Sequence, residues 1–144
     1  MTTSNAATNP SERNRAVIEQ FRANAGQVGG VWQDRPLVLL TTTGAKTGRQ
    51  HTTPLMSHRE GDRLFVFATM GGAPKSPAWY HNLVANPMVT VEVGADRFEA
   101  RAVVLKGAER DRIYAEQAKN FPQFGDYQTR TTRTIPVVAL ERTA

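Results

Sequence analysis

The chain has 144 residues, a formal net charge of +5 at pH 7, three histidines and no cysteine. Its length suits one domain and is short for two, and the lack of cysteine excludes disulfides, thiolate metal sites and a cysteine nucleophile. The positive charge favours an anionic partner. However, no recognised nucleic-acid module accompanies it, and His51, His58 and His81 show no metal-ligand spacing, so we expect neither nucleic acid nor a bound metal.

The first ten residues are mostly Thr, Ser, Asn and Ala. They bury too little to order themselves, so residues 1–10 are predicted to be a disordered tail ahead of a single domain at 11–144. They also lack the basic and apolar regions of a secretory signal, and no later run reaches the roughly 20 apolar residues of a membrane span. We therefore expect a cytoplasmic protein.

A short amphipathic helix is predicted from Ser11, with that residue as its N-cap and Gly26 as its end. Val17, Ile18 and Phe21 fall on one face, and three arginines lie elsewhere on the helix. A basic amphipathic helix can lie on the inner face of a membrane, as a peripheral contact. Packing against the protein's own sheet is the favoured interpretation.

Six strands are predicted in the rest of the chain, because the segments alternate or are rich in β-branched residues and short turns link several of them. The strands cover residues 36–42, 51–59, 63–69, 88–93, 97–105 and 134–140. Two helices interrupt them, at 76–87 and 107–121, the first with Ser76 as its N-cap and Pro77 at its first position. Regular strand–helix alternation is absent, so the fold class is α+β, mainly β, with an antiparallel sheet curled into a small barrel.

The segment 41–54, TTTGAKTGRQHTTP, lies between the first two strands and could bind an anion. Gly44 and Gly48 allow backbone amides to turn inward, and Lys46, Arg49 and His51 supply cationic donors, which together suit a phosphate. The spacing does not match a Walker loop, and a strand follows where a helix should. For this segment alone, a solvated hairpin tip is an equally good interpretation.

Two later segments could contact a flat ligand. In residues 68–82 a glycine pair permits close approach, Lys75 adds a cation, and Trp79 and Tyr80 offer flat apolar surface. Taken alone, a core tryptophan on a short helix explains that segment better. In residues 121–136 three aromatic side chains precede the last strand, and they either suit a planar substrate or pack a loop over an open barrel end.

Together the three segments resemble the deazaflavin-dependent nitroreductase family, relatives of the split-barrel flavin reductases. The matching stretches are LLTTTGAKTGRQHTTPL, GGAPKSPAWYHNLVANP and DYQTRTTRTIPVVAL, within a region that runs from about residue 37 to the end of the sequence. The resemblance implies a split β-barrel that binds the 5-deazaflavin coenzyme F420, whose tail carries a phosphate and glutamates. The reduced coenzyme would be the hydride donor.

The resemblance also implies the residues that bind the coenzyme. Lys46 and the backbone amides near Thr47 match the phosphate-binding loop, and Arg49 and Lys75 are further partners of the tail. The other coenzyme-binding residues lie on the next strand, on the loop after the third strand and on the helix that follows: His51, Thr52, Thr53, Pro54, Leu55, Met56, Ala68, Thr69, Met70, Gly71, Ala78, Trp79 and Asn82.

Two features of the chain depart from better-known relatives. His51 stands where they carry an arginine, which grips phosphate through two parallel hydrogen bonds and is always charged. Phe121, Phe124 and Tyr127 form the implied substrate wall, and relatives that reduce menaquinone and nitroimidazoles have tyrosines in place of the two phenylalanines. Tyr127 keeps its hydroxyl, and this hydroxyl or a backbone amide is the candidate to hydrogen-bond or protonate the reduced acceptor.

We therefore expect an oxidoreductase that passes a hydride from reduced coenzyme F420 to an electron-poor planar acceptor, such as a quinone, a nitro-compound or an activated enone. The coenzyme supplies the chemistry, so the protein needs to orient it, exclude water and stabilise the anion that forms. Two alternatives stay open. One is a non-catalytic deazaflavin carrier, and the other is a split-barrel reductase that uses FMN.

Overall fold

The computed structural model describes residues 10–143, so residues 1–9 of the predicted disordered tail lie outside the described residues. Six strands form a closed barrel in the order β1-β2-β3-β6-β5-β4, and every neighbouring pair is antiparallel. The strands are β1 (Leu37–Thr43), β2 (Gln50–Glu60), β3 (Arg63–Phe67), β4 (Met88–Val93), β5 (Asp96–Val104) and β6 (Val137–Arg142). The predicted mainly antiparallel barrel is confirmed.

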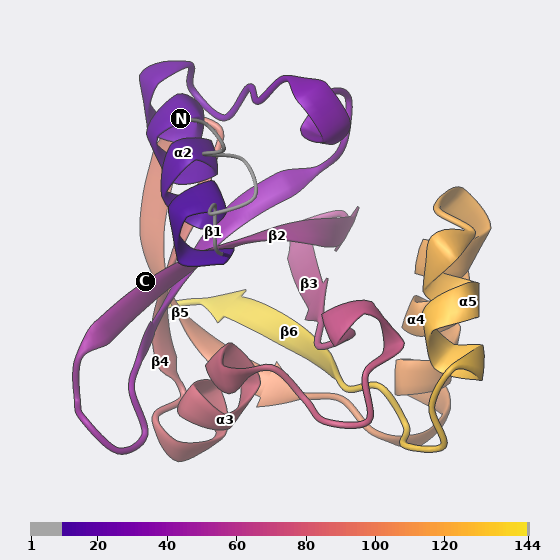
Figure 1. Cartoon of the computed structure of the whole chain (residues 1–144). Helices are drawn as coiled ribbons and strands as arrows, with labels where there is room; N and C mark the ends of the chain where they lie inside the picture. Colours follow the sequence, from indigo (N-terminus) through magenta and orange to yellow (C-terminus); the bar gives the residue numbers. More distant parts are fainter. Residues whose placement is uncertain (1–9, 144) are drawn as a thin grey trace, which may run out of the picture.

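Helices surround this barrel (Figure 1). They are α2 (Pro10–Ala23), α3 (Ala78–Ala85), α4 (Gly107–Asn120) and α5 (Gln123–Thr129), with short 3-10 turns η1 (Gly30–Trp32) and η2 (Met70–Gly72). Between residues 10 and 143, no helix is both long enough and apolar enough to cross a membrane.

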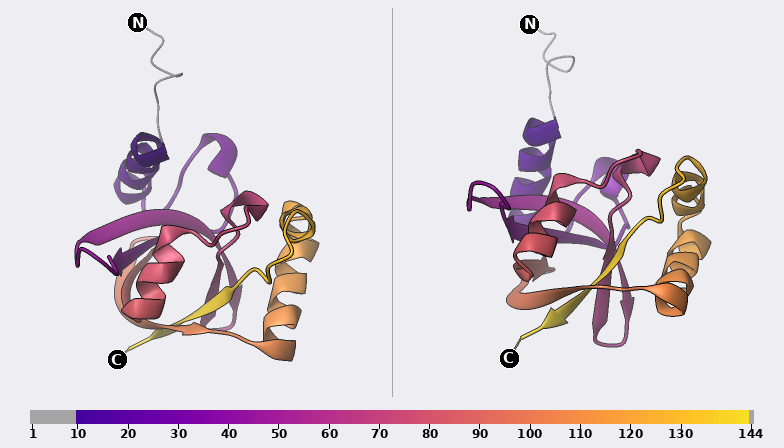
Figure 2. Two further views of the ribbon diagram at one scale, coloured as in Figure 1. Left: turned by 60° about the horizontal axis from the view of Figure 1, so that its bottom comes forward. Right: turned by 90° about the horizontal axis from the view of Figure 1, so that it is seen from below.

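Alternate strand residues point into the barrel, as the two-residue period of a strand requires. Val38, Leu40 and Val138 are almost fully buried in this interior cluster. Trp79 and Leu83 of α3 belong to the same cluster, and α3 lies across one end of the barrel (Figure 2). The tryptophan is therefore a core residue as well as a candidate ligand contact.

The outer face of β3 and β6 is covered by α4 and α5. Phe67 makes edge-to-face contacts with Tyr114 and Phe124, with ring centroids 5.9 and 5.5 Å apart. The Tyr114 hydroxyl donates a hydrogen bond of 2.6 Å to the Phe124 carbonyl. Burial raises the pKa of Tyr114 to about 12, so this hydroxyl keeps its proton and remains a donor.

One helix and the start of the last strand differ from prediction. The sequence does not predict α5, because Gly125 and the shortness of the segment weaken the helical signal, and tertiary packing of Phe124 holds the helix instead. The last strand begins at Val137 rather than 134, since the Ile135 carbonyl accepts from the Arg110 side chain and the Pro136 carbonyl accepts from a loop amide.

The start of α3 also differs from prediction. The helix begins at Ala78, Pro77 occupies the N-cap position, and no side chain caps the helix. Ser76 is therefore not the cap. Its hydroxyl instead accepts a hydrogen bond from Arg133, across 57 residues of sequence.

Helix α2 packs on the outer face of β1, where Phe21 is buried against Leu37 and Leu39. Val17 and Ile18 pack against the same cluster. The favoured interpretation of this helix, packing on the protein's own sheet, is confirmed. Because its apolar side is used in this way, peripheral membrane contact has no support.

The ends of α2 lie slightly earlier than predicted. The helix is described from Pro10, one residue before the predicted start at Ser11, and it ends at Ala23 rather than near Gly26. Two contacts then fix its last turn to the barrel. Arg22 donates to both carboxylate oxygens of the buried Glu92, at 3.0 and 2.8 Å, and Gly26 approaches the β4–β5 turn too closely to carry a side chain.

Candidate functional site

A cleft of about 1010 Å³ lies between α2, the loop after β1, the first part of β2 and the start of α3. Strand β2 pairs with β3 only from Ser57 onward, so residues 50–56 have one edge without a strand partner. The β2 residues that line the cleft all lie in this stretch. The lining residues are Asn14, Arg15, Ile18, Gly44, Ala45, Lys46, Thr47, Gln50, His51, Thr52, Thr53, Ala78, Trp79, His81 and Asn82.

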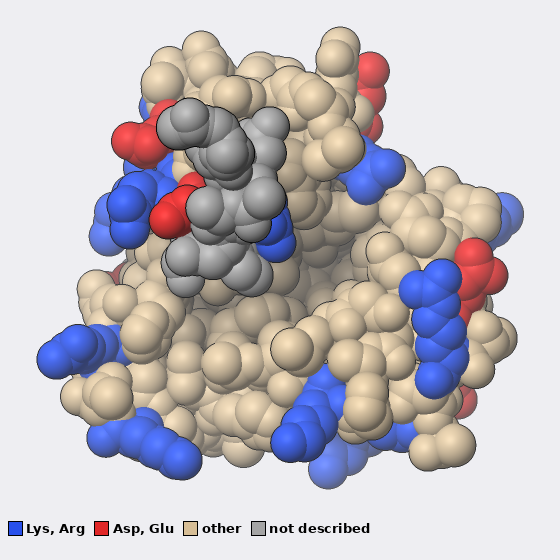
Figure 3. Space-filling view, in the orientation of Figure 1, with Lys and Arg blue, Asp and Glu red and all other residues tan. Residues whose placement is uncertain are grey.

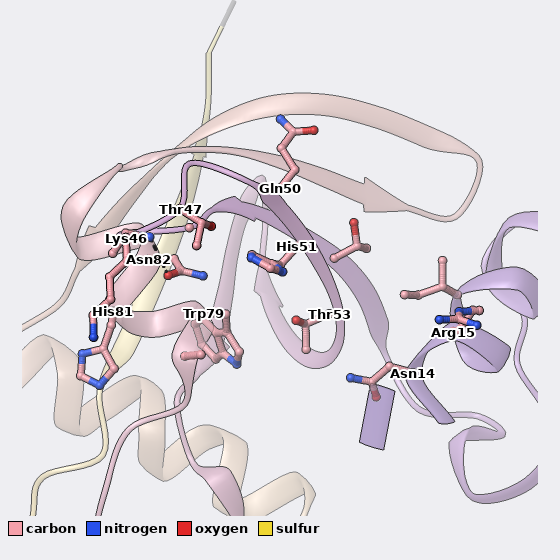
Figure 4. A pocket seen from close by; sticks show the side chains of 15 residues that line it. Asn14, Arg15, Lys46, Thr47, Gln50, His51, Thr53, Trp79, His81 and Asn82 are labelled. Atoms are coloured by element: carbon pink, nitrogen blue, oxygen red, sulfur yellow. Dashed lines mark hydrogen bonds between the residues drawn. The ribbon is translucent and has the colours of Figure 1, made fainter. Parts of the chain in front are cut away.

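These side chains are arranged along the cleft (Figure 4). Lys46, Asn82 and their neighbours lie at one end, Asn14 and Arg15 lie at the other, and Trp79 lies between them. A ligand that fills the cleft would therefore contact segments that are far apart in the sequence.

The loop after β1 is tightly closed. The Gly44 amide donates to the Arg49 carbonyl at 2.7 Å, and the Gly48 amide donates to the Gly44 carbonyl at 3.0 Å. A Cβ atom at Gly44 would stand 2.8 Å from the Thr47 hydroxyl oxygen. The backbone amides of Lys46 and Thr47, in contrast, donate to no acceptor in the described part of the chain. This leaves two backbone donors and an ammonium group for an anion.

Asn82 on α3 holds this loop in place. Its side-chain carbonyl accepts a hydrogen bond of 3.0 Å from the Ala45 amide, and its amide group donates to the Thr42 hydroxyl at 3.3 Å. Because both polar ends of Asn82 have protein partners, its first role is to fix the loop against β1. The loop is therefore prepared before a ligand arrives, which lowers the entropic cost of binding.

The charged side chains that line the cleft are basic. Arg15 and Lys46 line it together with His51 and His81, and no aspartate or glutamate of the described residues lines it. Within residues 10–143, neither Arg15 nor Lys46 forms an ion pair. Figure 3 shows the corresponding face hollowed near its middle, with Lys and Arg side chains close to the hollow. Such a surface attracts anions.

The cleft brings together eight of the predicted coenzyme-binding residues: Lys46, Thr47, His51, Thr52, Thr53, Ala78, Trp79 and Asn82. Sequence reasoning missed the contribution of α2, namely Asn14, Arg15 and Ile18. The basic helix was visible in the sequence, but no local signal indicates that it lies across from the loop after β1.

The other predicted coenzyme residues lie outside the cleft lining. Arg49 and Lys75 are exposed, as are Met70 and Gly71 on η2, and Thr69 is half-buried ahead of it. Pro54 and Ala68 are buried, while Leu55 packs with the barrel interior and Met56 with the outer cluster under α4. The role of all these residues toward a coenzyme stays a prediction.

The predicted substrate wall lies on α5 and just before it, away from the cleft lining. Phe124 is buried in the outer core, which supports its packing role. Phe121 and Tyr127 are half-buried, and the Tyr127 hydroxyl donates to no described residue. The wall adjoins η2, because a Cβ atom at Gly72 would stand 2.7 Å from the Tyr127 carbonyl oxygen.

A closed antiparallel barrel has here a long cleft beside one unpaired strand edge, and no described aspartate or glutamate lines it. This arrangement indicates a split-barrel protein with a site that suits an anionic ligand. The chain belongs to the F420H(2)-dependent quinone reductase family, which it matches over residues 13–142. It is therefore an oxidoreductase whose coenzyme is reduced F420, and the predicted family relationship and cofactor are confirmed.

Individual relatives agree with this assignment. An F420H(2)-dependent quinone reductase of Mycobacterium tuberculosis is 41% identical over 126 residues, which cover 85% of each chain. A solved F420-H2 dependent reductase (FDR-A) is 41% identical, with a TM-score of 0.69 over 78% of this chain and all of its own. Another structure, titled as a domain-swapped dimer, is 37% identical, with a TM-score of 0.71 over 92% of this chain and all of its own.

More distant structures share the fold alone. The haem storage protein HutZ of Vibrio cholerae is 15% identical, with a TM-score of 0.60 over 91% of each chain. At this level of identity the likeness concerns the barrel and carries no information on the ligand.

Replacing His51 with arginine is expected to tighten coenzyme binding, because the always-charged guanidinium can donate two parallel hydrogen bonds to a phosphate. We expect a gain of up to about tenfold, measured by fluorescence titration. An unchanged affinity would remove His51 from the site.

Proposed function

We propose that this protein transfers a hydride from reduced coenzyme F420 to a quinone, and that nitro-compounds and activated enones serve as further acceptors. The observation that carries the proposal is the cleft without carboxylates, which Lys46 and two free backbone amides line at one end and Arg15 at the other. Such a cleft suits a long ligand with several negative charges and disfavours cationic ligands.

The residues present fit this coenzyme. Its phosphate would be held by the Lys46 ammonium and the amides of Lys46 and Thr47, since three donors in one tight loop match three phosphate oxygens. The glutamates of its tail add carboxylates, for which the cleft offers Arg15 as a cationic partner and His81 as a hydrogen-bonding partner. A volume of about 1010 Å³ reaches the upper end of the range for small-molecule and cofactor sites, as a long coenzyme requires.

The bound coenzyme supplies the hydride, and the protein's residues orient the reactants. Trp79 and Thr53 offer the surface for a planar ring, and Trp79 is held firmly because most of it is in the barrel core. Asn14 and Ile18 of α2 form the opposite wall and restrict water. The unpartnered Tyr127 hydroxyl is our candidate to donate a hydrogen bond to the acceptor as negative charge develops there.

The decisive experiment titrates the protein with reduced F420 and with FMN, then supplies a panel of menaquinone, nitro-compound and enone acceptors while coenzyme oxidation is followed by absorbance. We expect tighter binding of F420 and turnover with the quinone. Binding without oxidation would identify a carrier, and tighter binding of FMN would identify an FMN enzyme. Tyr127→Phe, which removes only the hydroxyl, should slow acceptor reduction and leave coenzyme affinity unchanged.

A further inference from the structure

Arg133, in the segment between α5 and β6, binds a distant loop with its whole guanidinium group. Its Nε donates to the Ala73 carbonyl at 2.9 Å, and its Nη1 donates to the Ser76 hydroxyl at 3.1 Å. Its Nη2 donates to the carbonyls of Ala68 and Thr69, at 3.1 and 2.9 Å. One side chain thus contacts both ends of residues 68–76, the loop that leads from β3 to α3.

The acceptors of these hydrogen bonds are all neutral. The side chain of Arg133 is half-buried, and its burial lowers the pKa of this guanidinium. None of the described aspartates or glutamates forms an ion pair with it. Removing a charge from water without a counter-ion is costly, and here four hydrogen bonds to backbone and hydroxyl oxygens offset the cost. Because these acceptors belong to the loop, the hydrogen bonds form only when the loop keeps this conformation.

The loop has a conformation that needs external support. Met70, Gly71 and Gly72 have φ values of 46, 63 and 85°, so three residues in a row are left-handed. This region is unfavourable for methionine by about 1 to 2 kcal/mol. The hydrogen bonds inside the loop are few, from the Gly72 amide to the Thr69 carbonyl and from the Ala73 amide to the Met70 carbonyl. Arg133 supplies four further hydrogen bonds. The other connections are a hydrogen bond of 3.4 Å from the Arg130 side chain to the Gly71 carbonyl and one of 3.0 Å from the Ala68 amide to the Pro136 carbonyl.

The loop lies between the two parts of the proposed reaction site. Ser76 comes two residues before Ala78, which lines the coenzyme cleft, and Gly72 lies against the backbone of Tyr127. A displacement of residues 68–76 would move the start of α3 and the acceptor wall relative to one another. Hydride transfer is sensitive to such displacements, because a misplacement of about 1 Å can cost roughly 100-fold in rate.

We propose that Arg133 is a positioning residue, which fixes loop 68–76 so that the coenzyme cleft and the acceptor wall keep a productive arrangement. The expected effect of Arg133 on catalysis rests on the proposed function. The constraint on the loop rests only on the contacts of the coenzyme-free protein. The planar guanidinium is essential to this role. A lysine has a single nitrogen and cannot reach acceptors on both ends of the loop at once.

The test compares Arg133→Gln and Arg133→Lys with Arg142→Gln. Arg142 is the control, because it pairs with Asp96 and lies over the Phe98 ring but has no hydrogen bond to loop 68–76 or to the segment that carries Arg133. Hydrogen exchange of the coenzyme-free proteins is measured first. In both Arg133 variants the amides of Gly72 and Ala73 should exchange at least about tenfold faster than in the natural protein, and in Arg142→Gln they should not change.

The second measurement uses reduced coenzyme and menaquinone. We expect both Arg133 variants to lower kcat by at least about tenfold while changing the KM for menaquinone much less, and we expect Arg142→Gln to preserve kcat. Unchanged exchange in loop 68–76 would overturn the positioning role, whatever the coenzyme does. Faster exchange with unaltered kcat would show that the constraint is structural only. Failure of the natural protein to bind F420 would instead overturn the proposed function, because the exchange measurement needs no coenzyme.

Discussion

Replacing Gly72 with alanine is expected to lower the free energy of unfolding by about 2 to 4 kcal/mol, because two costs add. The residue has a φ of 85°, in the left-handed region where a side chain is strained. A Cβ atom would also stand 2.7 Å from the Tyr127 carbonyl oxygen and 3.0 Å from the Cβ of Arg130. The backbone of α5 would have to move, and with it the acceptor wall. Chemical denaturation measures the loss.

Gly71 is the natural control for this change. It has a φ of 63°, but a Cβ atom there would meet nothing within 4 Å. Gly71→Ala should therefore cost only the conformational term, about 1 kcal/mol. If the two variants lost the same stability, the close approach of η2 to α5 would not be a constraint on the fold.

Replacing Lys46 with alanine is expected to weaken coenzyme binding by roughly 10-fold to 150-fold, the equivalent of about 1.5 to 3 kcal/mol for a lost charge-assisted contact. The side chain lines the cleft and has no partner within residues 10–143, so folding should be unaffected. Fluorescence titration with F420 measures the change. Added salt should narrow the difference in coenzyme affinity between the natural protein and Lys46→Ala, since salt screens exposed charges.

Lys119→Ala is the charge-matched control, because Lys119 lies in the last turn of α4, far from the cleft lining. It removes the same net charge and should leave the affinity almost unchanged. Lys75→Ala tests a different point, namely whether this exposed residue is a partner of the tail. Equal affinities for Lys46→Ala and Lys119→Ala would mean that the loop after β1 is a solvated hairpin tip.

The parts of the site that could be predicted from sequence are those that depend on local backbone chemistry. Gly44 and Lys46 indicated a tight loop with cationic donors, and the structure shows that loop closed on itself with free amides. Strand periodicity likewise predicted the barrel. Pro54, Leu55 and Met56 illustrate the limit of such predictions. Successive side chains of a strand point to opposite faces of the sheet, and the resemblance does not say which face a ligand contacts.

Features that depend on distant contacts could not be predicted. Arg15 lies opposite Lys46 only because Phe21 and Arg22 fix α2 on the outside of the barrel, and neither contact leaves a local pattern. Arg133 looked like one of several basic residues in a polar segment. Its role depends on carbonyl groups about 60 residues earlier, which no periodicity or motif reports.

The position of β6 in the barrel has a consequence for synthesis on the ribosome. Residues 137–140 pair with β3, and residues 138–142 pair with β5, so the last strand joins two strands made much earlier. Until residue 142 has left the ribosome, both partners keep an unpaired edge. Such edges can pair with other chains. The nascent protein should therefore need chaperone protection until the barrel closes, and aggregation should be most severe for chains arrested before β6.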